Sequence, residues 1–165
     1  MSSPQLIIVS GGQTGVDRGA LNAALVAGTA CGGWCPAGRR AEDGTIARRY
    51  PLRETASTHY HVRTRQNVID SDGSLLIYFG TLEGGTARTL DFCHELHKPG
   101  YCLDAQRYSP AQAAQLIEQF LDDHHIVTLN VAGPRASKQA QAQAYTEETI
   151  GLLLRTRPAS QYTMP

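Results

Sequence analysis

The residues best suited to chemistry form a glycine-rich loop behind a short apolar run. The run LIIV ends at Val9, and the next residues read SGGQTGVDRGAL. Glycines let the backbone turn sharply and bring bare amides close to a ligand. A helix that begins near Val16 would point its positive end and free N–H groups at the same place, which suits a phosphate. The candidate contacts are Gly11, Gly12, Gln13, Thr14, Gly15 and Arg18.

The glycine spacing separates this loop from two familiar nucleotide motifs. It is neither the G-x-G-x-x-G of dinucleotide-binding folds nor the G-x-x-x-x-G-K-[ST] of a P-loop. The sequence therefore implies neither dinucleotide binding nor ATP hydrolysis. A tight strand-to-helix turn without a ligand is the alternative for this loop taken alone.

Two later loops carry a similar composition. LEGGTARTL places paired glycines and a threonine before a helical segment, and NVAGPRAS places an arginine behind Pro134. A guanidinium can bind a phosphate or carboxylate through two parallel N–H groups. The candidate contacts in these loops are Gly84, Gly85, Thr86, Gly133, Arg135 and Ser137.

Apolar runs alternate with amphipathic segments along the whole chain, which predicts an α/β fold with a parallel sheet covered on both faces. The expected strands are 6–9, 31–35, 74–79, 100–104 and 126–131. The expected helices are 16–27, 58–72, 89–98, 109–123 and 138–154, with Gly28 ending the first and Ser109 capping the fourth. In such a sheet the loops after the strands line the ligand crevice. All three special loops should therefore meet at one edge.

Length and composition indicate one soluble domain. The chain has 165 residues with 15 basic and 15 acidic side chains, so no overall field attracts nucleic acid or a membrane surface. We expect a single ligand-binding domain over 1–157 and a flexible tail over 158–165. Without a membrane span, a signal peptide or CxxC spacing, the sequence favours a cytoplasmic protein with reduced thiols.

A polar stripe on the second expected helix has two interpretations. Arg63, Asn67 and Asp70 fall on one face, whereas Val62 and Ile69 are expected to be buried. The stripe either points at the ligand or ties loops down by hydrogen bonds, and we expect the second.

Three other features also leave alternatives open. Asp17 either contacts Arg18 or a ligand amine, or only favours a helix N-terminus. Trp34 either stacks on a ligand or packs at the end of a strand. His59-x-His61 and His94-x-x-His97 have imaginable ligand spacing, but no third ligand matches, so we expect no protein-ligated metal. The cysteines are expected to be core residues.

Several segments together resemble the molybdenum carrier protein family, relatives of the lysine-decarboxylase-like phosphoribohydrolases and of DNA-processing protein A. The segments are GGQTGVDRGAL, GGWCPAGRRAEDG, RYPLRET, RTRQNVIDSD, GGTARTL and NVAGPRAS, in this order. The resemblance covers residues 7–154. It implies a three-layer Rossmann-like fold, a homo-oligomer (dimer or tetramer), molybdoenzymes as recipients of cargo, and binding of the molybdenum cofactor (molybdopterin), a pterin phosphate that carries molybdenum.

The resemblance also implies roles for a charged excursion over residues 37–57. Arg39, Arg40, Glu42 and Asp43 match the family there, and this loop could cover the pterin or the metal end. The alternative for Arg39 and Arg40 is a solvated or interface position. One departure is that the family often has Pro-Gly after the third loop, where this chain reads SKQAQAQAY.

The main competing function is a phosphoribohydrolase that cleaves the base from a nucleoside monophosphate. That family places a catalytic glutamate three residues after the threonine of its PGGxGTxxE loop, where this chain has Thr89. Glu83 lies before the glycines, and Asp91 lies two residues after Thr89. Without a carboxylate in register, we expect a binding protein with no catalytic residue, and a DNA-binding role lacks its basic groove.

Overall fold

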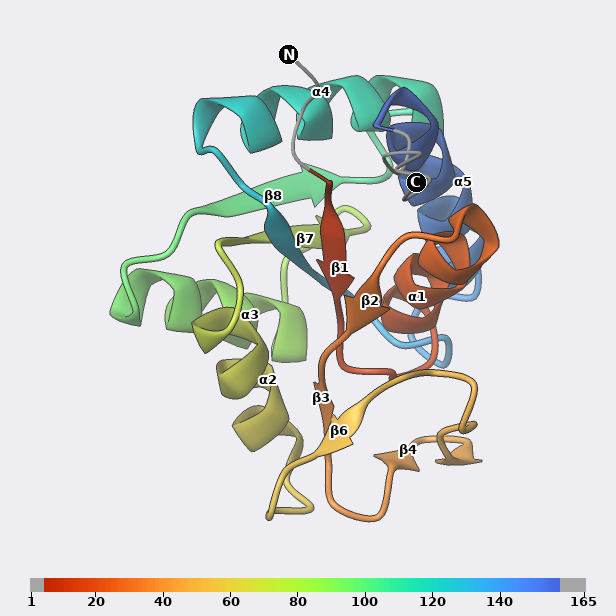
Figure 1. The fold of residues 1–165 in the computed structure, drawn as a ribbon, viewed down its shortest axis with the longest axis vertical. Coiled ribbons are helices and arrows are strands. Elements are labelled where there is room, and N and C mark those ends of the chain that lie inside the picture. The colour runs from red at the N-terminus through yellow and green to blue at the C-terminus, as the bar shows by residue number, and fades with distance from the viewer. Residues whose placement is uncertain (1–4, 158–165) are drawn as a thin grey trace, which may run out of the picture.

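The computed structural model describes residues 5–157, and its centre is a five-stranded sheet (Figure 1). Every pair of neighbouring strands in this sheet is parallel. The strands, in spatial order, are β2 (Cys31–Gly32), β1 (Ile7–Val9), β9 (Thr128–Ala132), β7 (Gly73–Tyr78) and β8 (Gly100–Asp104). The expected tail over 158–165 lies outside the described residues.

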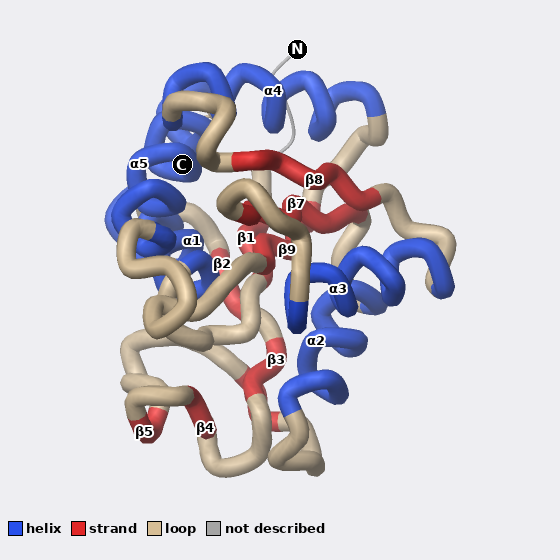
Figure 2. The backbone as a smooth tube through the Cα atoms, turned by 180° about the vertical axis from the view of Figure 1, so that it is seen from behind, coloured by secondary structure: helices blue, strands red, loops and turns tan. Residues whose placement is uncertain are grey.

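Helices cover both faces of the sheet. In Figures 1 and 2, α1, α4 and α5 gather on one side, and α2 and α3 pack together on the other. The helices are α1 (Val16–Ala27), α2 (Tyr60–Ile69), α3 (Gly84–Glu95), α4 (Pro110–Asp123) and α5 (Ala142–Thr156). This arrangement confirms the predicted three-layer, Rossmann-like α/β architecture.

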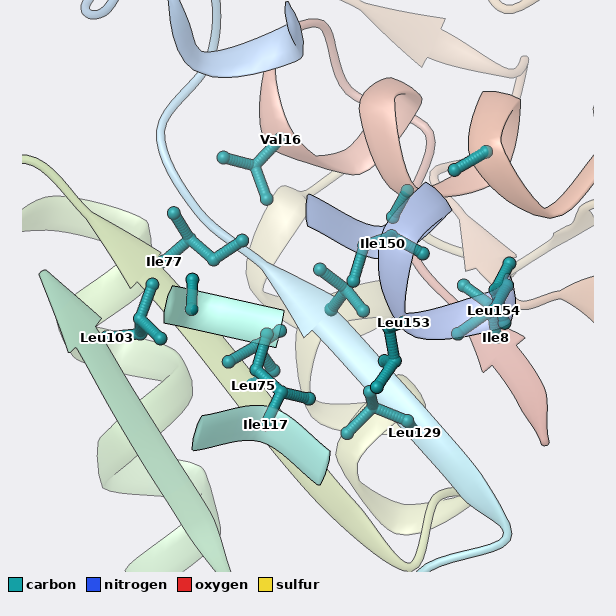
Figure 3. Close-up of a cluster of buried hydrophobic side chains, with 14 of the residues drawn as sticks. Ile8, Val16, Leu75, Ile77, Leu103, Ile117, Leu129, Ile150, Leu153 and Leu154 are labelled. Atoms are coloured by element: carbon teal, nitrogen blue, oxygen red, sulfur yellow. The ribbon is translucent and has the colours of Figure 1, made fainter. Parts of the chain in front are cut away.

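The main core lies between the sheet and the α1, α4 and α5 layer (Figure 3). Leu75 and Ile77 of β7 are fully buried there, because alternate residues of a strand point to the same face. They meet Ile117 of α4 and Ile150 of α5, both also fully buried. Fully burying a side chain of this size contributes about 1.5–3 kcal/mol.

Several local predictions are confirmed. Helix α1 has the predicted bounds and ends at Gly28, which adopts the left-handed conformation that a glycine C-cap favours. Ser109 caps α4 with its side chain in a capping box, and Pro110 occupies the first turn. Strand β8 also has its predicted bounds.

Other elements differ from the prediction. The expected strand 31–35 is divided at Gly33 between β2 and β3 (Trp34–Cys35), because Gly33 has φ 132 and leaves the main sheet. Helix α3 begins at Gly84 rather than 89, and α5 begins at Ala142 rather than 138. The latter start is delayed by a turn in which the carbonyl of Arg135 accepts the amides of residues 138 and 139.

Helix α2 buries a different face from the one predicted. Its N-cap is His59, its buried residues include Arg63 and Asn67, and Ile69 is exposed. The prediction that Val62 and Ile69 form the buried face was therefore wrong. Arg63 and Asn67 occupy the buried face because they bond backbone groups of other loops, and a sequence pattern does not reveal such partners.

Residues 36–57 form an arm beside the sheet, visible at the bottom of Figure 1. It contains the short hairpin β4 (Arg40–Ala41) and β5 (Gly44–Thr45), and β6 (Arg53–Glu54), which pairs with β3. A second core fixes the arm to α1 through Leu21, Cys35, Ala41, Ile46, Tyr50 and Leu52. The charged excursion of the sequence is thus a packed substructure.

Two further observations concern residues 5–157. No helix within them combines the length and apolarity needed to cross a membrane. They also bring together no group of three or more His, Cys, Asp or Glu side chains that could hold a metal ion. All four cysteines are free thiols; Cys35 and Cys93 are buried, and Cys31 and Cys102 are half-buried.

Candidate functional site

A cavity of about 240 Å³ opens at the carboxyl edge of the central sheet. Its walls come from the segments that follow β1, β7 and β9, from α2, and from the first turn of α3. The aromatic residues Tyr60, Tyr78 and Phe79 line it together with amide-bearing and charged residues. The cavity therefore offers both apolar faces and polar groups, as small-molecule sites commonly do.

The structure brings about half of the predicted site residues to this cavity. Gly11, Gln13, Gly85, Thr86, Gly133 and Arg135 line its wall. The others lie outside the wall: Gly12, Thr14, Gly15, Arg18, Arg39, Arg40, Gly84 and Ser137. Their contacts within the protein explain most of these positions.

In the first glycine loop, several amides already have partners. The Gln13 amide donates to Asp17 Oδ2 at 3.2 Å, and the Thr14 amide donates to the Gln13 side chain at 3.0 Å. The Val16 amide donates to the carbonyl of Pro134 at 3.2 Å. These N–H groups at the start of α1 are therefore not available to a ligand.

The glycines of this loop allow close packing of the chain on itself. A Cβ on Gly15 would lie 2.4 Å from the carbonyl oxygen of Pro134, and Gly15 has φ 84. A Cβ on Gly12 would lie 2.4 Å from the Leu52 side chain of the arm. The loop is a junction between α1, the arm and residues 133–137.

The first turn of α3 is arranged differently. Glu83 is its N-cap but makes no side-chain capping bond, and Gly84 and Gly85 are exposed. A Cβ on Gly85 would meet nothing within 4 Å. The first N–H groups of a helix have no intrahelical acceptor, so this end of α3 can receive an anion.

Two basic side chains, Lys138 and Arg135, line the same cavity. The Lys138 Nζ lies 3.4 Å from the position of a Cβ on Gly84, directly beside the positive end of α3. Arg135 lines the cavity, its Nε is buried without a hydrogen-bond partner, and its nearest carboxylate oxygen, on Glu42, is 3.4 Å away. The Glu42 carboxylate already neutralises part of the Arg135 charge, and an anion in the cavity would interact favourably with the Lys138 ammonium and the first turn of α3.

The other predicted arginines organise the arm. Arg18 pairs with Asp43 (2.7 Å), and Arg39 donates to the carbonyls of residues 46, 47, 50 and 52 at 2.8–3.2 Å. Arg40 donates to the Thr58 carbonyl and lies over the ring of Tyr60 at 4.7 Å. These guanidinium groups hold loop geometry.

Glu42 connects the arm to the third loop. It accepts hydrogen bonds from the Thr14 hydroxyl and from the Ser137 amide and hydroxyl. Desolvation raises the pKa of Glu42, but the hydrogen bonds from Ser137 and Thr14 outweigh it and bring the pKa below its ordinary value. The ionised form therefore fixes the turn that carries Arg135.

The polar stripe on α2 has both roles considered from the sequence: it ties loops down by hydrogen bonds, and part of it lines the cavity. The side chain of Asn67 bonds both the amide and carbonyl of Trp34, and Asp70 accepts the Trp34 indole N–H at 2.7 Å. Trp34 is half-buried outside the cavity, with the Arg53 guanidinium 4.4 Å from its ring centroid. Arg63 both ties a loop, through the Gly11 carbonyl at 2.6 Å, and lines the cavity.

Comparison with known proteins places the chain in a family. The model of the circularly permutated YpsA SLOG family matches residues 8–154. The chain belongs to this family. A crystal structure of a protein from Syntrophus aciditrophicus SB, named a putative molybdenum carrier protein, is 43% identical with a TM-score of 0.89. The match covers 92% of this chain and 96% of that one. No curated protein matches the chain.

These matches confirm the predicted resemblance. The carboxylates of the cavity bear on the competing hydrolase function. Thr89 occupies the register of the phosphoribohydrolase glutamate and donates its hydroxyl to the Gly85 carbonyl at 2.9 Å. Asp91 is exposed and lies outside the wall. Among the described residues that line the cavity, the carboxylates are Asp17 and Glu83. A phosphoribohydrolase that uses a carboxylate of the cavity wall would have to use one of these two groups.

Proposed function

We propose that this chain is a binding and carrier protein for the molybdenum cofactor, whose phosphate lies at the N-terminus of α3. The observation that carries the proposal is the convergence of Lys138, Arg135 and the uncapped first turn of α3. A phosphate would accept N–H bonds from α3 and neutralise both side chains. The carrier name of the 43% identical Syntrophus protein supports the same cargo.

The rest of the cavity suits the ring part of such a ligand. Its wall includes aromatic residues that can offer a flat ring an apolar contact, and its volume of about 240 Å³ lies just below the usual range for small-ligand sites, about 300–1,000 Å³. Carriage requires no acid, base or nucleophile in register, and Thr89 stands where the related hydrolases have their glutamate. Binding without chemistry is therefore the function we infer.

Thermal unfolding with a ligand panel tests this proposal. The panel contains the molybdenum cofactor, handled without oxygen, together with molybdate, AMP and inorganic phosphate. Cofactor at one hundred times its dissociation constant should add about 2.7 kcal/mol to stability, a rise in Tm of about 5–10 °C. Molybdate alone should give no rise.

Variants locate the phosphate. Lys138→Ala and Arg135→Ala should each weaken cofactor binding about tenfold or more, as the loss of a charge-assisted hydrogen bond does. Arg88→Ala is the matched control, because Arg88 is an exposed arginine of α3 outside the cavity wall. Stabilisation by AMP without stabilisation by cofactor would instead support the hydrolase, and base release should then depend on Asp17 or Glu83.

Assembly and delivery stay predictions from the resemblance, and the cytoplasmic location stays a prediction from the composition of the sequence. We propose a homo-oligomer, a dimer or tetramer, that acts in the cytoplasm and delivers cofactor to molybdoenzymes. Val26 and Leu25, at the end of α1, are 91% and 40% exposed and give apolar surface to such an interface. Sedimentation of the wild type and of Val26→Ser would measure the mass and the contribution of this surface.

A further inference from the structure

A buried pair of opposite charges lies in the cavity wall. Asp17, in the first turn of α1, and Arg63, in α2, both line the cavity. Their side chains are only 9% and 10% exposed, and Asp17 Oδ2 lies 3.7 Å from Arg63 Nη1. This distance is too long for a strong direct hydrogen bond, so the two groups form an ion pair without a hydrogen bond between them.

Both groups keep unused hydrogen-bonding capacity. Arg63 uses Nη1 on the Gly11 carbonyl and Nε on the Thr64 hydroxyl, and Nη2 has no partner among the described residues. Asp17 accepts one long bond, from the Gln13 amide at 3.2 Å. The neighbouring Ser10 hydroxyl gives its single proton to the Val131 carbonyl at 2.6 Å.

Electrostatics agrees with this description. Burial raises the pKa of Asp17 above its ordinary value, and the Arg63 guanidinium offsets only part of that rise. A buried carboxylate with so few donors is costly, and further N–H groups would lower the cost. A ligand in the cavity is the available source of such groups.

The pair offers one free donor group, Arg63 Nη2, beside the two carboxylate oxygens of Asp17. The complementary ring edge has a carbonyl oxygen, then a ring N–H, then an amino group, which is the edge of a 2-amino-4-oxopyrimidine. Pterins and guanine both carry this edge. Adenine offers an amino group and an unprotonated ring nitrogen there, so it would set a donor against the guanidinium and a lone pair against the carboxylate.

We propose that Asp17 and Arg63 select a phosphate-bearing ligand whose ring is a 2-amino-4-oxopyrimidine. Arg63 Nη2 donates to the ring carbonyl, and Asp17 accepts from the ring N–H and the 2-amino group. This inference rests on the proposed phosphate site, because Asp17 and Arg63 can contact the ring only when the phosphate is bound at α3. A pterin and a guanine nucleotide share the chemistry, so the test contains both.

Titration of wild-type protein with GMP, IMP, AMP, neopterin monophosphate and inorganic phosphate tests the selection without any variant. IMP differs from GMP only by the missing 2-amino group. We expect GMP and neopterin monophosphate to bind about 10–100-fold more tightly than AMP, with IMP between them, because a good bidentate contact discriminates by about this factor. The tighter of the two favoured ligands identifies the ring system.

Asp17→Asn sharpens the test. It should reduce the GMP-to-IMP preference to about one without weakening AMP binding, because the amide no longer sets a charge against the adenine ring nitrogen; a merely structural role of Asp17 would weaken the binding of all three nucleotides. Arg88→Ala should change no dissociation constant. Equal affinities for GMP, IMP and AMP, all lost in Lys138→Ala, would overturn the ring selection and keep the phosphate site. A wild type that binds none of these ligands, nor the molybdenum cofactor, would overturn both.

Discussion

The two glycine-bearing turns at residues 10–15 and 80–87 have similar sequences and different surroundings. In the first, the amides of Gln13, Thr14 and Val16 all donate to groups of the protein. In the second, the first turn of α3 has no side-chain cap and opens on the cavity beside Lys138. The turn that most resembles a phosphate loop in sequence is thus a structural junction, and the second is the turn at which we propose the anion site.

The difference shows that glycine serves two separate purposes. At Gly15 it allows another backbone to approach, since a Cβ would lie 2.4 Å from the Pro134 carbonyl. At Gly85 no atom lies within 4 Å of that position, so the missing side chain leaves space for a ligand. A methyl group added at each position therefore tests the two purposes separately.

Gly15→Ala should destabilise the protein most, by about 2–5 kcal/mol. The residue has φ 84 and ψ −128, a conformation that is costly for any side chain, and its Cβ would collide with the Pro134 carbonyl. Urea unfolding measures the loss. A loss below about 1 kcal/mol would mean that the junction relaxes easily and that the packing role is minor.

Arg39→Ala should cost about 2–3 kcal/mol, since its guanidinium donates to four carbonyls of the arm. The same urea titration measures it, with Arg48→Ala, an exposed arginine of the arm, as the control. The dissociation constant of the phosphate-bearing ligand should not change in Arg39→Ala. Weaker ligand binding in a folded Arg39→Ala variant would indicate that Arg39 contributes to the ligand site.

Gly85→Ala should leave stability within about 0.5 kcal/mol and weaken ligand binding about tenfold, roughly 1.4 kcal/mol. The added methyl group points into open space at the α3 N-terminus, where the phosphate is proposed to lie. Calorimetric titration with the ligand measures the change. Unchanged affinity would contradict the location of the phosphate at this helix.

The link between the arm and the third loop should depend on pH. The folded pKa of Glu42 lies below its ordinary value of 4.5, so its stabilisation is present above that value and is lost as pH falls through the folded pKa. At pH 6, Glu42→Gln should cost about 0.5–1 kcal/mol, and the difference should shrink toward pH 3. Urea unfolding at both pH values checks this against Glu148→Gln, whose residue is exposed on α5. A difference independent of pH would contradict a role for the Glu42 charge.

Much of the fold follows from local sequence features. The Ser109-Pro110 start of α4, the glycine end of α1 and the apolar strands each reflect preferences of a few neighbouring residues. The alternation of strands and helices gives a parallel sheet, and the parallel sheet gives the edge at which the cavity lies. The sequence by itself therefore determined the architecture and the edge of the sheet at which the cavity lies.

Tertiary structure alone decided which polar groups are free at that edge. The amides of Gln13, Thr14 and Val16 donate to Asp17, to Gln13 and to a carbonyl more than one hundred residues away, whereas the Lys138 ammonium lies beside the first turn of α3. Likewise, Arg63 is buried because its partner is the Gly11 backbone. A loop's conformation depends on its own residues, but the partners of its hydrogen-bonding groups depend on which distant segments pack against it.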